Sequence, residues 1–339
     1  MKKAPTTIKD IARILNISTS TVSRALNGQA DINPTTKKEV LALVEKLEYE
    51  PNHIALSLKQ RKTHIVGVII PETENQFYAK TISGIQEIAT EYGYNVMICQ
   101  SHESHEIEKN SVQMLVSSQV DGLIVALSTE TKNYEHFAKI YQKEFPIVFF
   151  DRICEAFDTP KIIADNYDGS LKATEHLIDV GCKRIAHIAG PQNLFDCHQR
   201  LKGYLAALKK HHLPIDEDLI IYSNFRKENV REYTSTLLDL PTPPDAIMAI
   251  NDATAIEMMH IIKERKFKIP DDIAIIGFNN DYVSGYVDPP LTSIEFQALE
   301  IGRQAASMLM KELANESFST GKKLVKSQLI IRKSSLKKH

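Results

Sequence analysis

The chain has 339 residues, of which 43% are hydrophobic and 25% charged. This length predicts two to three units, and the composition excludes an extensively disordered protein. The net charge is −2, but about ten Lys/Arg against six Asp/Glu fall within residues 1–61, so the front of the chain is basic and the rest acidic. An anionic partner is therefore favoured for the first unit only.

The sequence carries no sign of export, a membrane span or a cofactor. The first residues lead into a polar amphipathic segment instead of an apolar one, and no run approaches the ~18 apolar residues of a membrane span. The four cysteines, Cys99, Cys154, Cys182 and Cys197, lack the short spacing of zinc or redox motifs. We expect a cytoplasmic protein with free thiols and no cofactor.

The first residues predict two short helices joined by a tight turn. Thr7 is placed to cap a helix, with Asp10 three residues later, and Ser18 to cap a second helix that ends at Asn27 and Gly28. The apolar residues of both fall at helical spacing: Ile8, Ile11, Ala12, Leu15, Val22, Ala25 and Leu26. This arrangement is typical of a helix-turn-helix.

A third helix is expected from Asn33 and Pro34 to a point before Pro51. The outer face of the second helix carries small hydroxyls and one guanidinium: Thr19, Ser20, Ser23 and Arg24. Such side chains suit the major groove of DNA. A polar helical hairpin that reads no sequence is the alternative.

From residue 63 apolar strands alternate with amphipathic helices. The expected strands are Ile65 to Ile70, Val96 to Cys99, Leu123 to Ala126, Ile147 to Phe150, Ile185 to Ala189, Leu219 to Tyr222, Ile247 to Ile250 and Ala274 to Phe278. This alternation predicts a parallel α/β fold, and the number of units predicts two doubly wound sheets. A ligand cleft is then expected between two lobes, at the carboxyl ends of the strands.

Several segments of the chain resemble the lac repressor (LacI/GalR) family. They include Thr7 to Ala12, Ile17 to Gly28, Tyr49 to Asn52 and Ala55 to Leu58, and in the core Asn75 to Tyr78, Phe150 to Arg152, His187 to Pro191, Asn251-Asp252 and Pro289 to Ile294. The resemblance implies a small all-α helix-turn-helix headpiece and an α/β core of two doubly wound parallel-sheet lobes, similar to type I periplasmic binding proteins. It covers almost the whole chain.

The resemblance also implies domain boundaries. Residues 1–51 would bind DNA, 52–62 would form a hinge helix and linker, and 63–335 would bind an effector. The chain would cross between lobes near residues 162, 292 and 323. Lobe one would comprise 63–162 and 293–322, and lobe two 163–292 and 323–335.

The resemblance assigns DNA contacts residue by residue. Thr19, Ser20 and Arg24 match base-reading positions, whereas Thr7, Ser23, Asn27, Asn33 and Thr36 match positions near phosphates. In the hinge, Asn52, Ala55 and Leu58 match residues at the minor groove, with Leu58 as a wedge between base pairs. The alternative for Leu58 is an apolar linker residue.

Candidate effector-binding residues follow the expected strands. Asp151, Arg152, Asn251 and Asn279 stand at strand ends and Arg200 opens a later helix, while Phe77, Tyr78 and Phe225 would form apolar walls. Each polar residue has an alternative role as a strand-end cap. Asn279 stands where sugar-binding relatives often have Asp, which leaves the ligand's identity open.

These features predict a sequence-specific DNA-binding transcription regulator, a repressor of carbohydrate-use genes in the leading interpretation. A small polar ligand, with a sugar as first candidate, would change its affinity for a pseudo-palindromic double-stranded operator. A homodimer is expected, because half-site readers pair on two-fold DNA, and the tail after Ile331 lacks leucine heptads. The sequence leaves open whether the ligand induces or corepresses, and whether a protein coregulator acts.

Two rival classes are disfavoured. An enzyme would need features such as a G-x-G-x-x-G after the first strand, a P-loop or a nucleophile elbow, which the chain lacks. His102 and His105 near Glu103 and Glu106 suggest metal binding, but we expect a solvated polar cluster there. A periplasmic binding protein is disfavoured by the DNA reader and by the absence of an export signal.

Overall fold

In the computed structural model the chain forms two compact units, Met1–Thr63 and His64–His339. The structure describes residues 6–26, 32–47, 49, 62–225, 227–316 and 320–337. No helix within these ranges is long and apolar enough to cross a membrane.

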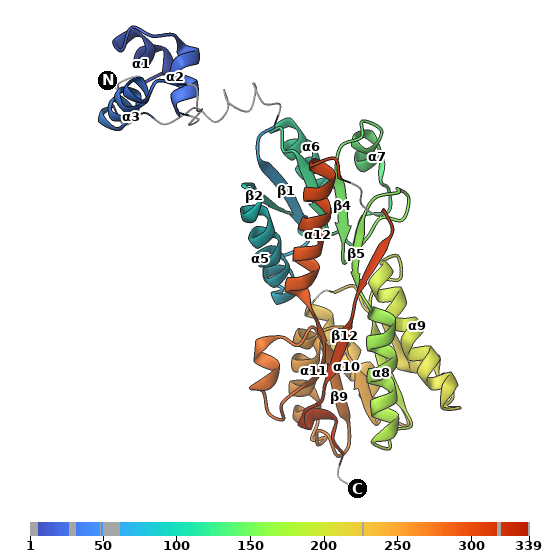
Figure 1. Cartoon of the computed structure of the whole chain (residues 1–339). Helices are drawn as coiled ribbons and strands as arrows, with labels where there is room; N and C mark the ends of the chain where they lie inside the picture. Colours follow the sequence, from blue (N-terminus) through green and yellow to red (C-terminus); the bar gives the residue numbers. More distant parts are fainter. Residues whose placement is uncertain are drawn as a thin grey trace. The chain divides into compact units, whose positions relative to one another are not determined.

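The first unit contains three short helices, α1 (Ile8–Ile14), α2 (Thr19–Leu26) and α3 (Pro34–Lys46) (Figure 1). Thr7 and Asp10 form the expected capping box, and the Ser18 hydroxyl accepts from the backbone N–H of Thr21 at 3.1 Å. The helices enclose one small core of Ile11, Ala12, Val22, Ala25 and Val40. The predicted helix-turn-helix with a third supporting helix is confirmed.

The second unit contains two six-stranded sheets. The first has the strand order β11-β5-β4-β3-β1-β2 and the second the order β12-β10-β9-β8-β6-β7. All pairs are parallel except β10 with β12. The strands are β1 (Ile65–Ile70), β2 (Asn95–Gln100), β3 (Gly122–Val125), β4 (Ile147–Phe150), β5 (Lys161–Ala164), β6 (Ile185–Ala189), β7 (Ile220–Tyr222), β8 (Ala246–Met248), β9 (Ala274–Phe278), β10 (Thr292–Phe296), β11 (Lys322–Val325) and β12 (Ser327–Ile330).

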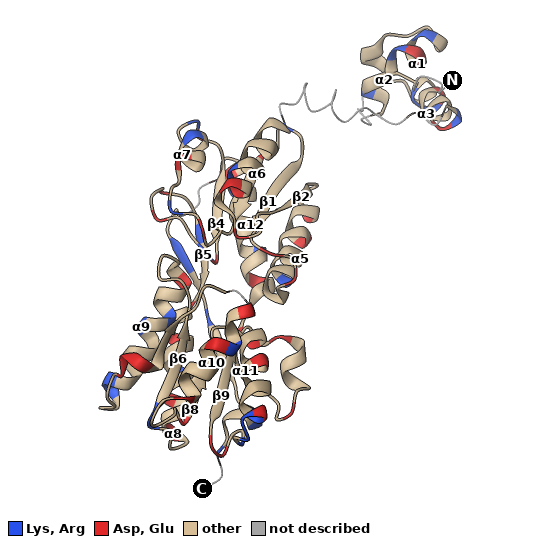
Figure 2. Cartoon of the chain, turned by 180° about the vertical axis from the view of Figure 1, so that it is seen from behind, with Lys and Arg blue, Asp and Glu red and all other residues tan. Residues whose placement is uncertain are grey.

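Helices cover both faces of each sheet. Their bounds are α5 (Gln76–Glu91), α6 (His105–Ser117), α7 (Glu135–Tyr141), α8 (Asn166–Asp179), α9 (Phe195–Lys210), α10 (Val230–Leu238), α11 (Asp252–Glu264) and α12 (Ala298–Leu313). In the first lobe α5 and α12 pack on one face and α6 and α7 on the other, and in the second lobe α8 and α9 pack opposite α10 and α11. Because both faces are covered, central strands such as β1, β6 and β9 carry no charged residue (Figure 2). The predicted fold class is confirmed.

The chain passes between the lobes a few residues later than the sequence predicted. Strands β5 and β11 belong to the first sheet and β10 and β12 to the second. The crossings therefore follow Ala164, Phe296 and Val325 instead of lying near residues 162, 292 and 323. The sheets contradict the expected assignment of residues 163–164 and 323–325 to lobe two and of residues 293–296 to lobe one, because each strand is completed before the chain crosses.

Two helix pairs pack closely through glycines. A Cβ added at Gly302 of α12 would lie 2.0 Å from the Thr81 carbonyl oxygen of α5, and one at Gly84 would lie 2.1 Å from that of Leu299. Gly203 of α9 plays the same part against Tyr167 of α8. These contacts bring the backbones of neighbouring helices together and leave no room for a side chain.

Candidate functional site

The outer face of α2 presents the predicted base-reading side chains. Thr19, Ser20 and Arg24 are exposed, and Val22 and Ala25 are buried on the opposite face. The Ser20 hydroxyl lies 2.7 Å from that of Ser18, so it also takes part in capping the helix. The pattern follows from helical periodicity, because the apolar side must face the core of the unit.

Three of the predicted phosphate-contacting residues, Thr7, Asn33 and Thr36, lie at helix starts, and Ser23 lies in the middle of α2. Thr7 caps α1, and Asn33 caps α3 through a 2.9 Å bond from the Thr35 N–H to its Oδ1. Ser23 and Thr36 are partly buried on α2 and α3. The predicted contacts Asn27, Asn52, Ala55 and Leu58 lie outside the described residues.

In the second unit, Asp151 is buried directly after β4. Its backbone adopts a φ of 56°, a left-handed conformation that few non-glycine residues adopt. The hydroxyl of Tyr78 on α5 donates to Asp151 Oδ2 at 2.9 Å. This turn places the Asp151 side chain at the C-terminal ends of the strands, pointing away from β4.

Arg152 links the same turn to the opposite lobe. Its Nη1 donates to both Glu103 carboxylate oxygens, at 2.7 and 2.6 Å, and Thr129 Oγ1 lies 3.3 Å away. The guanidinium carbon stands 5.1 Å from the ring centroid of Phe225, which follows β7 of the second lobe. Arg152 is therefore held by a carboxylate of its own lobe and contacts an aromatic ring of the other.

Arg200 of α9 is fixed within the second lobe. Its Nε donates to Asn166 Oδ1 at 2.8 Å and its Nη1 to the Ile250 carbonyl oxygen at 2.7 Å. Its guanidinium carbon lies 4.6 Å from the Phe278 ring centroid and 5.3 Å from that of Phe296. Because most of its surroundings belong to its own lobe, the position of this guanidinium is determined in advance of any ligand.

Asp196 is an acidic residue at the lobe boundary that the sequence pattern did not predict. It is buried on α9, one helical turn before Arg200, and it raises the pKa of Asp151 from the other lobe. Burial is the main cause that raises the Asp151 pKa to about 6, and Arg152 and Arg200 act in the opposite direction. The spacing of four residues from Arg200 was the one sign in the sequence that could have identified Asp196.

Several buried polar atoms around these residues are without hydrogen-bond partners. Within the described part of the chain they include Arg152 Nε, Asp196 Oδ1, Gln192 Oε1 and Ser223 Oγ. Unpaired buried polar groups are costly, so native structures seldom retain them without a function. One unpaired donor and several acceptors thus stand at the strand ends of both lobes.

The other predicted residues lie around the cluster of Asp151, Arg152, Asp196 and Arg200, and they make different contacts. Phe77 packs against Phe296 at a ring-centroid distance of 6.4 Å, next to Arg200. Asn251 caps α11, since its Oδ1 accepts from the Thr254 N–H at 2.8 Å, which is the alternative that the sequence left open. Asn279 adopts a φ of 103° directly after β9. The structure therefore brings the predicted aromatic and charged residues together, and Asn251 has a structural role in addition.

The lobes are in contact at this cluster. Asn193 Nδ2 donates to the Thr129 carbonyl oxygen at 3.0 Å, and the Tyr282 N–H donates to Gln76 Oε1 at 2.8 Å, each bond joining one lobe to the other. A surface cavity of about 660 Å³ lies at the lobe boundary, lined by Gln76, Lys80, Asn280, Asp281, Tyr282, Gly285, Tyr286 and Arg332. None of the predicted effector residues lines this cavity. Phe77, Tyr78, Asp151, Arg152 and Arg200 are buried, whereas Phe225, Asn251 and Asn279 are half-buried.

Comparison with known proteins gives matches over nearly the whole chain. The family "Bacterial regulatory proteins, lacI family" matches residues 7–52, and "Periplasmic binding protein-like domain" matches residues 174–335. Catabolite control protein A of Priestia megaterium is 34% identical over 312 residues, covering 92% of this chain and 93% of that protein. The HTH-type transcriptional repressor CytR of Escherichia coli (strain K12) is 30% identical over 326 residues, covering 96% and 95%.

Solved structures give the same result. The transcriptional regulator CelR in complex with cellobiose superimposes with a TM-score of 0.75 and 26% identity, covering 97% of this chain and 99% of that one. A lac repressor dimer bound to operator and the anti-inducer ONPF gives a TM-score of 0.88 at 24% identity, covering 98% and 100%, which shows the shared fold.

Proposed function

Because the chain belongs to the LacI family of bacterial regulatory proteins, we propose that it is a transcriptional repressor whose affinity for its operator changes when a small polar ligand binds between the core lobes. The family consists of regulators and not of enzymes. The observation that supports the ligand site best is the buried cluster of Asp151, Arg152, Asp196 and Arg200, in which unpaired polar atoms remain.

The chemistry of the cluster favours a neutral polyhydroxylated ligand, a sugar above all. Each sugar hydroxyl donates and accepts, which matches an unpaired donor at Arg152 and unpaired acceptors at Asp196 and Gln192. The carboxylates Asp151, Asp196 and Glu103 offset the two guanidinium groups, so the site does not favour a strongly anionic ligand. The ring of Phe225 offers an apolar face, and the similar CelR structure holds cellobiose.

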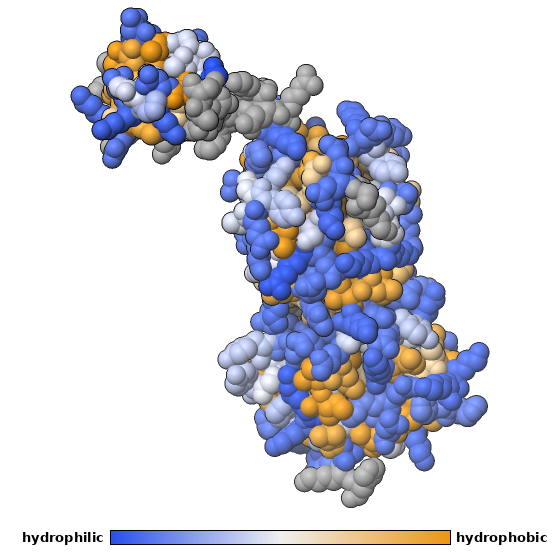
Figure 3. Space-filling model, viewed as in Figure 1, coloured by the Kyte–Doolittle hydropathy of each residue, from blue (hydrophilic) through white to orange (hydrophobic). Residues whose placement is uncertain are grey.

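The first unit would read a pseudo-palindromic operator as part of a homodimer. Thr19, Ser20 and Arg24 would contact bases, while Thr7, Ser23, Asn33 and Thr36, together with Asn27, would contact phosphates. The hinge residues Asn52, Ala55 and Leu58 would contact the minor groove. Large side chains that could support self-association are exposed on the core unit, among them Tyr92, Ile98, Tyr282 and Tyr286. Figure 3 shows that hydrophobic residues also reach the surface of this unit on the face in view.

The deciding experiment combines DNA binding with a panel of simple sugars. The full chain would first select its site from random-sequence duplexes, and its affinity for that site would then be measured with and without each mono- and disaccharide. One sugar should change the operator affinity by roughly 5- to 150-fold. Asp196→Asn removes a buried acceptor while keeping the shape of the side chain, so it should abolish the sugar response and retain operator binding.

Exposed Asp271→Asn serves as the control for an acid-to-amide change, since this residue lies on the surface of the same lobe. An Asp196→Asn protein with an undiminished sugar response would remove Asp196 from the site. Failure of the chain to select any DNA sequence would contradict the proposed function as a whole.

A further inference from the structure

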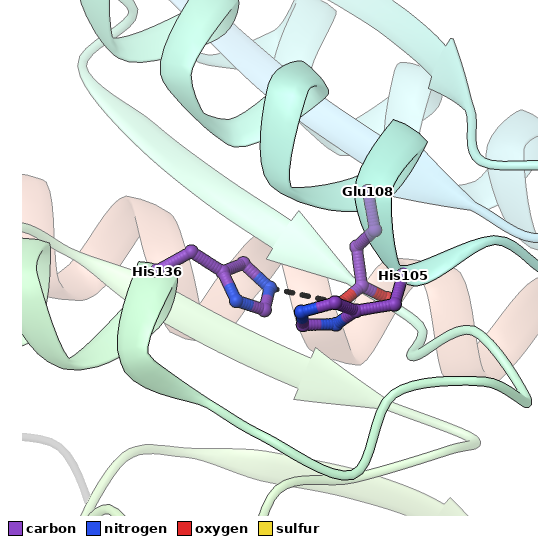
Figure 4. Close-up of side chains that lie close together, drawn as sticks. All are labelled: His105, Glu108 and His136. Atoms are coloured by element: carbon purple, nitrogen blue, oxygen red, sulfur yellow. Dashed lines mark hydrogen bonds and ion pairs between the residues drawn. The ribbon is translucent and has the colours of Figure 1, made fainter.

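Two histidines and a glutamate converge on the first lobe, outside the cleft cluster. His105 and Glu108 lie three residues apart on α6, so they share one face of that helix, and His136 lies near the start of α7. Figure 4 shows the two imidazole rings and the carboxylate directed toward one another. We expected His105 to lie in a solvated polar cluster with His102, but it faces Glu108 and His136, which is far from it in the sequence.

The geometry of the three side chains suits a metal ion. One ligand atom from each lies within 4.8 Å of the others, and His136 Nε2 is 2.9 Å from Glu108 Oε1. Glu108 and His136 are buried and His105 is partly exposed. An ion could therefore enter from the side of His105, and a water molecule could complete its coordination there.

Neighbouring groups already orient the carboxylate. Glu108 is fully buried, its Oε2 accepts from the Ser128 N–H at 2.7 Å, and its Oε1 accepts from the Thr131 hydroxyl at 2.8 Å. Outer hydrogen bonds of this kind are typical of metal ligands, because they fix the ligand's direction. They also explain how a carboxylate is retained in the interior of the lobe.

We propose that His105, Glu108 and His136 bind a divalent transition-metal ion, Zn²⁺ foremost. Two imidazole nitrogens and one carboxylate oxygen, with a fourth position open to water, form a common zinc ligand set. Mg²⁺ and Ca²⁺ require mainly oxygen ligands, so these two nitrogens disfavour them. A plain Glu108–His136 hydrogen bond involves two of the three residues. His105 has a long hydrogen bond of 3.4 Å from its Nδ1 to Thr131 Oγ1 and an edge contact with the His136 ring at a centroid distance of 5.1 Å, and a shared ion explains why both imidazoles converge on the carboxylate.

The ion would add a link between parts of the first lobe that hydrogen bonds already join. It would tie α6 to α7 and, through Ser128 and Thr131, to the loop between β3 and α7. Thr129 of that loop donates to Glu103, which holds Arg152 of the cleft cluster. Zinc would thus stiffen a loop that supports the proposed ligand site.

The test is a titration of the full chain with Zn²⁺ after removal of metal with a chelator. Calorimetry should give one ion per chain, and Co²⁺ should produce the visible absorption of a tetrahedral complex. His105→Ala should lower the Zn²⁺ affinity at least about tenfold and abolish the Co²⁺ absorption, since losing a direct ligand costs no less than losing an outer contact. Zinc should also slow hydrogen exchange at the Ser128 amide in the unmodified chain and not in His105→Ala.

His102→Ala is the matched control, because this histidine lies three residues before His105 and bonds to Gln100 instead of Glu108. It should bind Zn²⁺ as the unmodified chain does. Equal Zn²⁺ affinity in the unmodified and His105→Ala chains, or no binding at micromolar Zn²⁺, would overturn the proposal. His105 is partly exposed, so its alanine variant should fold, and Glu108→Gln with the same loss of affinity would give an independent check.

Discussion

The Asp151 carboxyl group combines three unfavourable conditions at one residue: burial, a left-handed backbone and a second carboxylate across the lobe boundary. Such strain is retained where the surroundings require it, and it clusters at functional sites. The sequence predicts Asp151 as an effector-binding residue because it follows a strand. For Asp196 the sequence offers only its spacing of four residues from Arg200, because the effect of Asp196 depends on which groups the first lobe places opposite it.

Asp151→Asn should change how stability depends on pH. The folded pKa of about 6 exceeds the ordinary value of 3.8, so the folded chain binds this proton more tightly than the unfolded chain does. The contribution of Asp151 to the free energy of unfolding is therefore largest below about pH 4 and is lost as the pH rises through about 6. At pH 7.5 the variant should have a higher free energy of unfolding than the unmodified chain, by a few kcal/mol at most. At pH 4.5 this difference should be much smaller.

Urea unfolding at both pH values measures this difference, with exposed Asp271→Asn as the control. A variant whose stability relative to the unmodified chain is the same at both pH values would show that Asp151 does not titrate as described.

Arg24→Ala should reduce discrimination between operator sequences by about 1 to 3 kcal/mol if the guanidinium contacts a base. The exposed Arg13 of α1 provides a matched comparison, since it is paired with Asp10 on a helix that is not expected to read bases. Arg13→Ala should affect all sequences alike. The test is to measure the affinity of each variant for the selected site and for single-base variants of that site. If Arg24→Ala loses the same affinity for every sequence, Arg24 contacts a phosphate and not a base.

At the scale of elements, the sequence predicted eight strands, including the edge strands β2 and β7, and missed β5, β10, β11 and β12. Long apolar runs such as Ile65–Ile70 mark strands that are covered on both faces. The missed strands contain polar or charged residues, among them Lys161 in β5, Glu295 in β10 and the two exposed lysines that begin β11, so they lack that pattern. Their positions depend on pairing with distant residues, which periodicity within a segment cannot reveal.

The α5–α12 contact should tolerate no side chain at Gly302. An added Cβ would meet the Thr81 carbonyl oxygen, and backbone atoms cannot move aside as a flexible side chain can. Gly302→Ala should therefore destabilise the chain by about 1 to 3 kcal/mol, although alanine favours helices by about 1 kcal/mol. Gly285→Ala is the control, since a Cβ there would meet nothing within 4 Å. A stabilised Gly302→Ala chain in thermal unfolding would contradict this packing.

For the whole molecule, the proposed regulation requires that ligand and DNA affect one another equally. If a sugar changes operator affinity by a given factor, the operator must change sugar affinity by the same factor. Calorimetric titration of sugar into the free chain and into its operator complex tests this equality. Asp196→Asn should give no heat in either titration, and a sugar that binds with the same affinity in both states would show that the ligand does not regulate DNA binding.

The late crossing of the chain affects how the protein is made. Strand β11 completes the edge of the first sheet and β12 that of the second, with only Lys326 between them. On the ribosome, neither lobe has its last strand until residues 322–330 have emerged, and until then β5 and β10 present unpaired edges. Unpaired edges invite pairing with other chains. Newly made protein is thus prone to aggregate until these two strands are in place, and a chain that stops before residue 322 leaves both lobes unfinished.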